Sequence, residues 1–343
     1  MTTARLDTEL VRRGLARSRT RAAALVTGGL VTVDGCPVRR SAQPVPDTAE
    51  IVVTAGAQDD VSRGARKLAG ALDDIARLAP GALDPNGARC LDAGASTGGF
   101  TQVLLRRGAA HVLAVDVGHG QLDPSIGADP RVTAVEGVNV RDLELGLVAS
   151  GAAGDVPEHV GRPVDVVVAD LSFISLRTVA AALVPAVRPG GQLLLLVKPQ
   201  FEVGRERLGR GGVVESDALR AEAVTGVAET LVDLGVRLCG VVPSGLAGEA
   251  GNRELFLWGT RRVPEGAAVE GAAVEGAAME GRAVEGAAVE GSAAIEGTTL
   301  SEGPGVAAWR EDVRRAVVGG EPLLLGTPPV PCWARPAEGG GAR

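Results

Sequence analysis

Short apolar runs alternate with helix-like patterns along the chain from Arg66 onward. The apolar runs are rich in Val, Leu and Ile, and between them apolar residues recur with the spacing of one helix face. This alternation is typical of a doubly wound, mostly parallel sheet with helices on both faces. We therefore predict an α/β domain whose strands lie near residues 89–93, 111–116, 132–135, 164–169, 192–198, 236–242 and 254–259.

The first 55 residues predict a smaller module of two helices and a hairpin. A short helix ends at Gly14, and Ser18 caps a second helix that ends at Val26. An alternating run of apolar and polar residues then predicts a strand that enters the hairpin. Residues 1–55 are expected to form an α+β module, joined to the large domain by a linker over 56–64.

A five-residue repeat of Glu-Gly-Ala-Ala-Val occupies residues 263–304. A period of five matches neither a helix nor a strand, so no face collects the apolar residues. Eight Glu against one Arg give this region the whole net charge of the chain, -7. We interpret it as a flexible acidic insert, because a folded repeat array normally has units of about 20 residues or more. A last helix is expected over 305–318, with Trp309 as its anchor, before a Pro- and Gly-rich disordered tail over 319–343.

The composition indicates a globular protein of the cytoplasm. No apolar stretch approaches the roughly 18 residues of a membrane span, and the N-terminus lacks the apolar core of a signal peptide. The four cysteines are dispersed without a CxxC pair, and the three histidines show no ligand spacing. We therefore expect neither a metal site nor a disulfide framework.

Only two lysines occur among the 35 basic residues, Lys67 and Lys198. Arginine stays protonated at any accessible pH, whereas a buried lysine can lose its proton and act as a base or a nucleophile. Lys198 ends an apolar run, and Lys67 lies near the start of a helical pattern. Both are candidates for chemistry; the alternative is that an Arg-biased chain simply retained two lysines.

A Gly-rich turn between a strand and a helix is the candidate cofactor site. The next strand ends in Asp116, 22 residues after Gly94, where an acid that binds a ribose is expected. A dinucleotide would need Gly-x-Gly-x-x-Gly, whereas this turn reads Gly-x-x-x-Gly-Gly and follows Asp92. An acid there suits a ligand with an ammonium group, which points to S-adenosylmethionine; the alternative is a purely structural turn. The candidate cofactor-binding residues are Asp92, Gly94, Ser96, Thr97, Gly98, Gly99, Phe100, Asp116, Asn139 and Asp170.

Three further candidates lie at strand ends. Asp170 ends a fourth strand, Lys198 ends a fifth, and Glu254 opens a later one. Open α/β sheets bind their ligands outside the carboxyl ends of the strands, so these side chains should converge on one crevice. A lone Asp at a strand end is usually a cap, and it is the combination with the two lysines that indicates chemistry.

The N-terminal module contains five arginines between positions 12 and 21 and no acid in that window. A basic helix face of this kind is typical of a surface that meets phosphates. The candidate phosphate-binding residues on this face are Arg12, Arg13, Arg17, Arg19 and Arg21.

In this order the motifs resemble the TlyA-type ribosomal RNA 2'-O-methyltransferases, a family historically labelled hemolysins, whose catalytic domain is similar to FtsJ-type RNA methyltransferases. The resemblance covers about residues 5–262. The motifs that carry it include Ser62-Arg-Gly-Ala-Arg-Lys67-Leu, Asp92-Ala-Gly-Ala-Ser-Thr-Gly-Gly-Phe-Thr, Val115-Asp116-Val-Gly, Asp170-Leu-Ser-Phe-Ile-Ser, Val197-Lys198-Pro-Gln-Phe-Glu and Gly251-Asn-Arg-Glu254.

The resemblance implies a Rossmann-like, S-adenosylmethionine-dependent methyltransferase domain over 65–262 and an N-terminal RNA-binding module of the S4 type. The RNA-binding residues that it implies in this module are Arg5, Arg12, Arg13, Arg17, Ser18, Arg19 and Arg21. It implies methylation of a ribose 2'-hydroxyl, of a cytidine, in 16S or 23S ribosomal RNA or both. The Lys-Asp-Lys-Glu tetrad of the family maps onto Lys67, Asp170, Lys198 and Glu254.

The expected reaction needs a base, because a ribose hydroxyl is a poor nucleophile until its proton is removed. Lys198 is the candidate general base, and the nearby ammonium of Lys67 should favour its neutral form. Asp170 would hold and orient Lys198, and Glu254 would orient Lys67 or the ribose.

The chain departs from the family pattern in two places, and two other functions compete. Some relatives carry a linker with Arg and Trp, which residues 55–60 lack, and the acidic repeat is foreign to the pattern. One alternative is an RNA-binding ribosome-assembly factor without catalytic activity, which predicts a broken tetrad or cofactor loop; neither is broken. The other is a membrane-lytic protein, which needs a membrane-inserting segment that we do not find.

Overall fold

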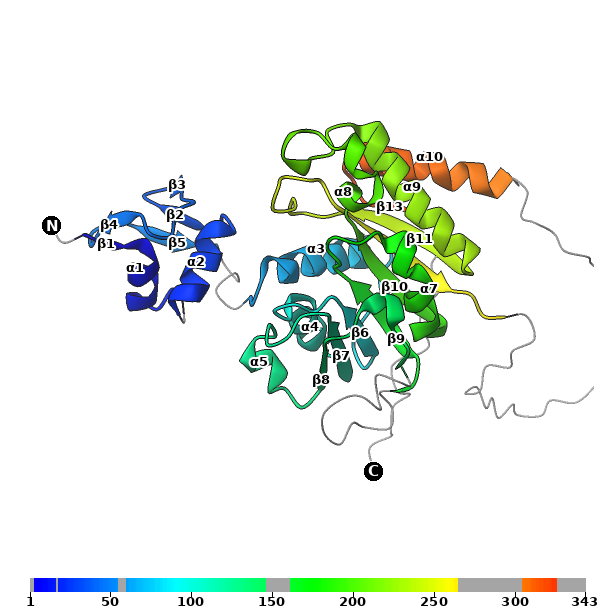
Figure 1. The fold of residues 1–343 in the computed structure, drawn as a ribbon, viewed down its shortest axis with the longest axis horizontal. Coiled ribbons are helices and arrows are strands. Elements are labelled where there is room, and N and C mark those ends of the chain that lie inside the picture. Colours follow the sequence, from blue (N-terminus) through cyan, green and yellow to red (C-terminus); the bar gives the residue numbers. More distant parts are fainter. Residues whose placement is uncertain (1–2, 17, 55–59, 146–160, 265–303, 326–343) are drawn as a thin grey trace, which may run out of the picture.

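The computed structural model describes residues 3–16, 18–54, 60–145, 161–264 and 304–325. Figure 1 shows a small N-terminal unit of short strands and two helices, followed by a large domain built on one sheet. Residues 56–59 of the predicted linker, nearly all of the acidic repeat and the last part of the predicted tail lie outside the described residues.

The N-terminal unit has its own apolar core, formed mainly by residues of its two helices and of β2 and β5. Helix α2 begins as expected, because Ser18 Oγ accepts a hydrogen bond from Arg21 N at 3.1 Å. An Asp34-Gly35 turn with positive φ at both residues closes the predicted hairpin. The elements are β1 (Thr3–Arg5), α1 (Leu6–Arg12), α2 (Arg19–Thr27), β2 (Val31–Val33), β3 (Cys36–Pro37), β4 (Pro44–Pro46) and β5 (Ile51–Val53).

The large domain is built on an eight-stranded sheet with the order β13-β11-β12-β10-β9-β6-β7-β8. The five strands from β10 to β8 are parallel, and β12, β11 and β13 extend the sheet in antiparallel fashion. This confirms the predicted α/β fold with a mostly parallel sheet. The strands are β6 (Arg89–Ala93), β7 (His111–Asp116), β8 (Val132–Glu136), β9 (Val164–Ala169), β10 (Val187–Val197), β11 (Val236–Pro243), β12 (Leu255–Arg261) and β13 (Leu323–Leu324).

Successive residues of the central strands point to opposite faces of the sheet, and each face has its own core. On one face Leu91, Val167 and Leu195 pack with helices α7, α9 and α10. On the other face Cys90 and Leu194 pack with helices α3 and α4. The near-continuous apolar runs seen in the sequence are therefore those of strands buried on both faces. The α-helices are α3 (Arg63–Leu78), α4 (Gly99–Arg106), α5 (Pro124–Gly127), α7 (Leu176–Ala186), α8 (Pro199–Glu202), α9 (Asp217–Asp233) and α10 (Pro304–Gly319).

The large domain begins earlier than the sequence pattern indicated. Helix α3 starts at Arg63, inside the range predicted as linker. The residues before it are also held, because Asp60 forms an ion pair with Arg106 of α4 at 2.7 Å. Val61 N donates to the side chain of Gln102, also on α4, at 3.0 Å.

The C-terminal segment returns to the sheet. Helix α10 covers the predicted helix, and Trp309 packs against the core as expected. The prediction that the chain lacks structure beyond Gly319 is wrong for residues 320–325, where β13 pairs with β11 through Leu323 and Leu324. Backbone pairing with an exposed sheet edge supplied order that the Gly- and Pro-rich composition did not reveal.

Candidate active site

Strand order brings three of the candidate side chains to one edge of the large sheet. Asp170 and Lys198 directly follow the parallel strands β9 and β10, so both lie at the carboxyl edge. Strand β12 runs antiparallel to β10, with Val197 opposite Leu255. The amino end of β12 therefore lies at the same edge, and it places Glu254 beside Lys198.

The first pair of charged side chains is Lys198 with Asp170. Lys198 Nζ lies 2.7 Å from Asp170 Oδ1 and donates a hydrogen bond to Ser172 Oγ at 2.8 Å. Lys198 is buried, and the Asp170 side chain keeps 20% of its surface exposed. The amine is thus held by an ion pair and a hydrogen bond whose partners both belong to the segment after β9.

The second pair is Lys67 with Glu254, and it is more deeply buried. Lys67 Nζ donates to Glu254 Oε2 at 2.6 Å, with 9% and 2% of the two side chains exposed. Gln200 Nε2 approaches the other carboxylate oxygen at 3.5 Å, and Gln200 is only two residues from Lys198. The segment after β10 therefore connects the two pairs, and the structure brings all four tetrad residues together.

Helix α3 reaches this edge because small residues let it pack tightly. A Cβ on Gly64 would lie 3.6 Å from Asp170 Oδ2, and a Cβ on Gly99 would lie only 2.1 Å from Ser62 Oγ. Gly64 and Lys67 are three residues apart and so share a face of the helix. The start of α3 thus contacts both the cofactor loop and the segment that carries Asp170.

Asp92 lies beneath the candidate cofactor loop and is fully buried. Its Oδ2 accepts hydrogen bonds from Thr101 N at 2.8 Å and from Thr101 Oγ1 at 2.7 Å, which caps the first turn of α4. Its Oδ1 has no hydrogen-bond partner among the described residues. Burial raises the pKa of this carboxyl to about 7, although the bonds from Thr101 oppose the shift. An ammonium donor would satisfy Oδ1, but a ligand reaches it only if the loop above it moves.

The loop itself is shaped around Asp116. Ser96 has a positive φ of 47° and donates its backbone N–H to Asp116 Oδ2 at 2.8 Å, while Gly118 N donates to Asp116 Oδ1 at 2.7 Å. Each carboxylate oxygen retains a lone pair, so Asp116 can still accept from the two hydroxyls of a ribose. Gly98, with φ 89°, is the N-cap residue that precedes helix α4. The donor and acceptor set of this loop fits a nucleoside.

Three other cofactor candidates have different surroundings. Phe100 is buried in the core, 6.0 Å from Phe256 between ring centroids, so it supports the loop from beneath rather than facing a ligand. Thr97 is half-buried, and its carbonyl accepts from Asp123 N at 3.2 Å. Asn139 is exposed at the end of β8 and caps a short turn. Cofactor contacts by Thr97 and Asn139 stay predictions.

The candidate RNA-binding arginines of α1 and α2 are largely paired within the module. Two buried acids of α1, which lie just before the acid-free sequence window, each bind two arginines. The pairs are Asp7 with Arg5 (2.7 Å) and Arg19 (3.2 Å), and Glu9 with Arg12 and with Arg13 (2.7 Å). Hydrogen bonds from Arg5 and Arg12 hold the pKa values of Asp7 and Glu9 below their usual range. The basic face is therefore partly neutralised.

The remaining candidate RNA-binding residues differ in their exposure and in their contacts. Ser18 caps α2, Arg21 is buried, and Arg17 lies outside the described residues. By contrast, Arg39 and Arg40 after the hairpin are exposed, and their guanidinium groups have no ion pair or hydrogen bond within the described part of the chain. Sequence analysis missed this pair, although two adjacent arginines after a hairpin were a visible signal.

Two aromatic residues beside the lysines were also missed. Phe173 has a positive φ of 65° and is 91% exposed, and its ring lies 5.3 Å from that of Phe201. Each follows a tetrad residue by three positions, Phe173 after Asp170 and Phe201 after Lys198. Ser172 and Gln200 lie in the same two motifs, so membership of a motif was the signal that could have identified all four residues.

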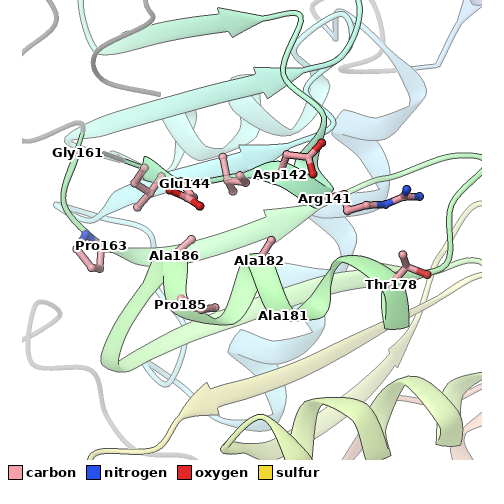
Figure 2. Close-up of a pocket in the computed structure, with 12 residues that line it drawn as sticks. Arg141, Asp142, Glu144, Gly161, Pro163, Thr178, Ala181, Ala182, Pro185 and Ala186 are labelled. Carbon is pink, nitrogen blue, oxygen red and sulfur yellow. The ribbon is translucent and has the colours of Figure 1, made fainter. Parts of the chain in front are cut away.

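The pocket in Figure 2 lies elsewhere on the domain. It is formed between the turn at Val140–Asp142 and helix α7, and it extends along α7 from Thr178 to Ala186. None of the candidate site residues lines it. Across the described residues, no group of three or more His, Cys, Asp or Glu is arranged to hold a metal ion. In the same part of the chain, no helix combines the length and apolar character needed to span a membrane.

Comparison with known proteins gives two family matches. Residues 61–261 match the FtsJ-like methyltransferase family, and residues 4–51 match the S4 domain. The chain is 52% identical over 256 residues to the 16S/23S rRNA (cytidine-2'-O)-methyltransferase TlyA of Mycobacterium tuberculosis, which covers 74% of this chain and 89% of the relative.

Two further similarities extend over most of the chain. Hemolysin A of Brachyspira hyodysenteriae is 32% identical over 250 residues, which is 73% of this chain and 97% of that protein. A solved structure of a hemolysin-type protein from Streptococcus thermophilus superimposes with a TM-score of 0.56 at 32% identity, covering 76% of this chain and 90% of that one.

Proposed function

The chain belongs to the TlyA group of the FtsJ-like methyltransferase family and carries an N-terminal S4 domain, and from this membership we propose that it methylates ribose 2'-hydroxyls in ribosomal RNA, with S-adenosylmethionine as the methyl donor. The relative from Mycobacterium tuberculosis is named for cytidines of 16S and 23S RNA. A cytidine in one or both subunits is therefore the proposed target. The convergence of two lysine–carboxylate pairs beside a nucleoside-type loop is the observation that carries the proposal.

The residues of the loop fit the cofactor. When bound, S-adenosylmethionine supplies an electrophilic methyl group on a sulfonium. Asp116 would accept from its ribose hydroxyls, and the buried carboxyl of Asp92 would attract its ammonium group. Ser96, exposed at the tip of the loop, would contact it through backbone or hydroxyl.

Lys198 is the proposed general base. Lys198 Nζ, in its neutral form, would accept the proton of the 2'-hydroxyl as the 2'-oxygen takes the methyl group that S-adenosylmethionine would supply. Asp170 and Ser172 would fix the position of Nζ, at 2.7 and 2.8 Å. Alignment of the reacting atoms by these contacts would account for much of the acceleration.

The pair Lys67–Glu254 would act as a rigid support for the ribose. Its two charges satisfy each other in a buried environment, so neither side chain is free to move. Gln200 approaches Glu254 from the Lys198 side. The pair would thereby hold the distance between helix α3 and the base.

The exposed Phe173 packs against the half-buried Phe201, and Phe173 directly follows the Ser172 that binds Lys198. The whole chain contains only four Phe, three Trp and no Tyr, so an exposed Phe at this position is unusual for its composition. Single-stranded RNA bases are commonly recognised by stacking on such rings. We propose that the base of the target nucleotide stacks on Phe173 when the ribose reaches Lys198.

The proposal is tested by incubating the full chain with S-adenosylmethionine and with unmethylated small and large ribosomal subunits, and then mapping 2'-O-methyl groups. A methylated cytidine is expected in at least one subunit. In the cell, the proposed place of the reaction is the cytoplasm, where ribosomes are assembled. Lys198→Ala should bind subunits and cofactor but transfer no methyl group. Tight subunit binding without transfer by the unchanged chain would support the assembly-factor alternative instead.

A further inference from the structure

Glu202, the last residue of α8, fastens the segment that connects β9 to α7. Its Oε2 accepts a hydrogen bond from Ser175 Oγ at 2.5 Å, and its Oε1 accepts one from Leu176 N at 2.8 Å. Both donors lie at the start of α7, where backbone N–H groups have no partner within the helix. The carboxylate thereby holds the carboxyl-terminal end of segment 170–176 in place.

The amino end of the same segment is held from the same place. Lys198, at the other end of α8, binds Asp170 at 2.7 Å and Ser172 at 2.8 Å. Lys198 and Glu202 are four residues apart. One short stretch of chain therefore clamps segment 170–176 at both ends.

The residue between the two anchors is strained. Phe173 has a φ of 65°, a left-handed conformation that bulky side chains rarely adopt. Such a conformation persists only where the surrounding structure holds it. Its ring contacts Phe201, which again belongs to α8, at 5.3 Å between centroids. Release of either anchor should let this backbone relax and withdraw the exposed ring from the site.

Burying the Glu202 carboxylate costs free energy, and a role in packing alone would not require a charged residue there. Burial is the main cause that raises the pKa of this carboxyl, and the bonds from Ser175 and Leu176 oppose the shift. The position at the amino end of α7 also favours a negative charge. A glutamine could keep both contacts, because its carbonyl can accept from Leu176 N and its amide can donate to the Ser175 hydroxyl.

We infer that Glu202 is a positioning residue for methyl transfer, which holds segment 170–176 so that Asp170, Ser172 and Phe173 keep their places around Lys198. Glu202 itself contacts the segment and no reacting group. The inference rests on the proposed function, because it assigns Glu202 a role in the same reaction.

The test compares Glu202→Ala and Glu202→Gln in the full chain, with Glu206→Ala as a control. Glu206 lies four residues further along the chain and is exposed, and its substitution by Ala removes the same charge. Glu202→Ala should lower kcat about a hundredfold, the scale expected from a misplacement of about 1 Å. Binding of S-adenosylhomocysteine should weaken far less than kcat falls, because Asp116 and the Gly-rich loop keep their own hydrogen bonds, although Gly94 borders Asp170. The kcat of Glu202→Gln should stay within about threefold of that of the unchanged chain. The kcat of Glu206→Ala should equal that of the unchanged chain.

Hydrogen exchange of peptides covering segment 170–177 provides a second measurement that needs no activity. Exchange should be faster in Glu202→Ala but not in Glu202→Gln. If Glu202→Ala does not fold, Ser175→Ala removes one of the two bonds to Glu202, together with the bond that Ser175 Oγ accepts from Arg177 N, and it should lower kcat about tenfold.

Unchanged kcat and exchange in Glu202→Ala would overturn the inference, as would a Gln variant as impaired as the Ala variant. If the unchanged chain methylates neither subunit, the proposed function fails, while the exchange measurement still decides whether Glu202 clamps the segment.

Discussion

Removing one member of the buried pair Lys67–Glu254 should destabilise the protein more than removing both. The two side chains are 9% and 2% exposed and lie 2.6 Å apart. A single substitution leaves the other charge buried without its partner, which typically costs about 3–5 kcal/mol. In a domain of this size each kcal/mol shifts the thermal midpoint by roughly 2–4 °C, so Lys67→Met or Glu254→Met should lower Tm by roughly 6–12 °C or more.

The double variant, Lys67→Met with Glu254→Met, should recover most of this loss. Apolar residues of similar volume often replace a buried ion pair without net cost, because the desolvation of both charges disappears with them. The double variant should nevertheless remain inactive, since neither charge is left to support the ribose. The pair would then be present for chemistry and not for stability.

The assay is thermal unfolding of the four proteins at one pH, followed by circular dichroism, together with methyl transfer to ribosomal subunits. Single variants within about 2 °C of the unchanged chain would refute the reasoning, because the pair would then not be buried as the structure shows. A double variant no more stable than the weaker single variant would show that packing, and not charge, causes the loss.

Four other outcomes are expected. Lys198→Arg keeps the charge but cannot act as a base, so methyl transfer should fall about a hundredfold with S-adenosylhomocysteine binding intact; near-normal turnover would leave the lysine only an electrostatic role. The folded pKa of Asp92, about 7, lies above its ordinary value of 3.8, so the folded state binds the extra proton between these values. Stability to urea should therefore fall as pH rises from about 4 to about 7 and then level off, and Asp92→Asn should flatten this decline. Phe173→Ala should raise KM for the subunit about tenfold at unchanged cofactor affinity, and an unchanged KM would remove the stacking role. Arg39→Ala with Arg40→Ala should reduce the slope of log affinity against log salt by about 1.4–1.8, whereas an equal slope would place the phosphate contacts elsewhere.

The sequence alone was sufficient for the fold class, and it singled out the two lysines that the structure places in ion pairs. Strands buried on both faces leave near-continuous apolar runs, and the predicted positions of β6, β7 and β9 agree with the structure. Lys67 and Lys198 stood out because the chain otherwise uses only arginine. Residues at strand ends share an edge in any parallel sheet, so their convergence followed from the pattern.

Only the tertiary structure decided which groups meet. Lys67 and Glu254 are 187 positions apart, and their pairing depends on the antiparallel register of β12 and on the close packing of α3. Periodicity shows that a strand exists but not which strand lies beside it. The same limit applies to Glu202: the sequence places it in the motif of Lys198, but only the structure shows that it bonds Ser175 and Leu176.

The acids that neutralise the arginines of α1 show this limit at short range. The sequence window from 12 to 21 contains no acid. Nevertheless, the buried acids Asp7 and Glu9, which precede this window, bind four of the candidate arginines. In the same way, the composition of the tail did not reveal that Leu323 pairs with β11. Composition and spacing report what each segment favours by itself, whereas ion pairs and strand pairing are set by distances between segments that only the folded chain defines.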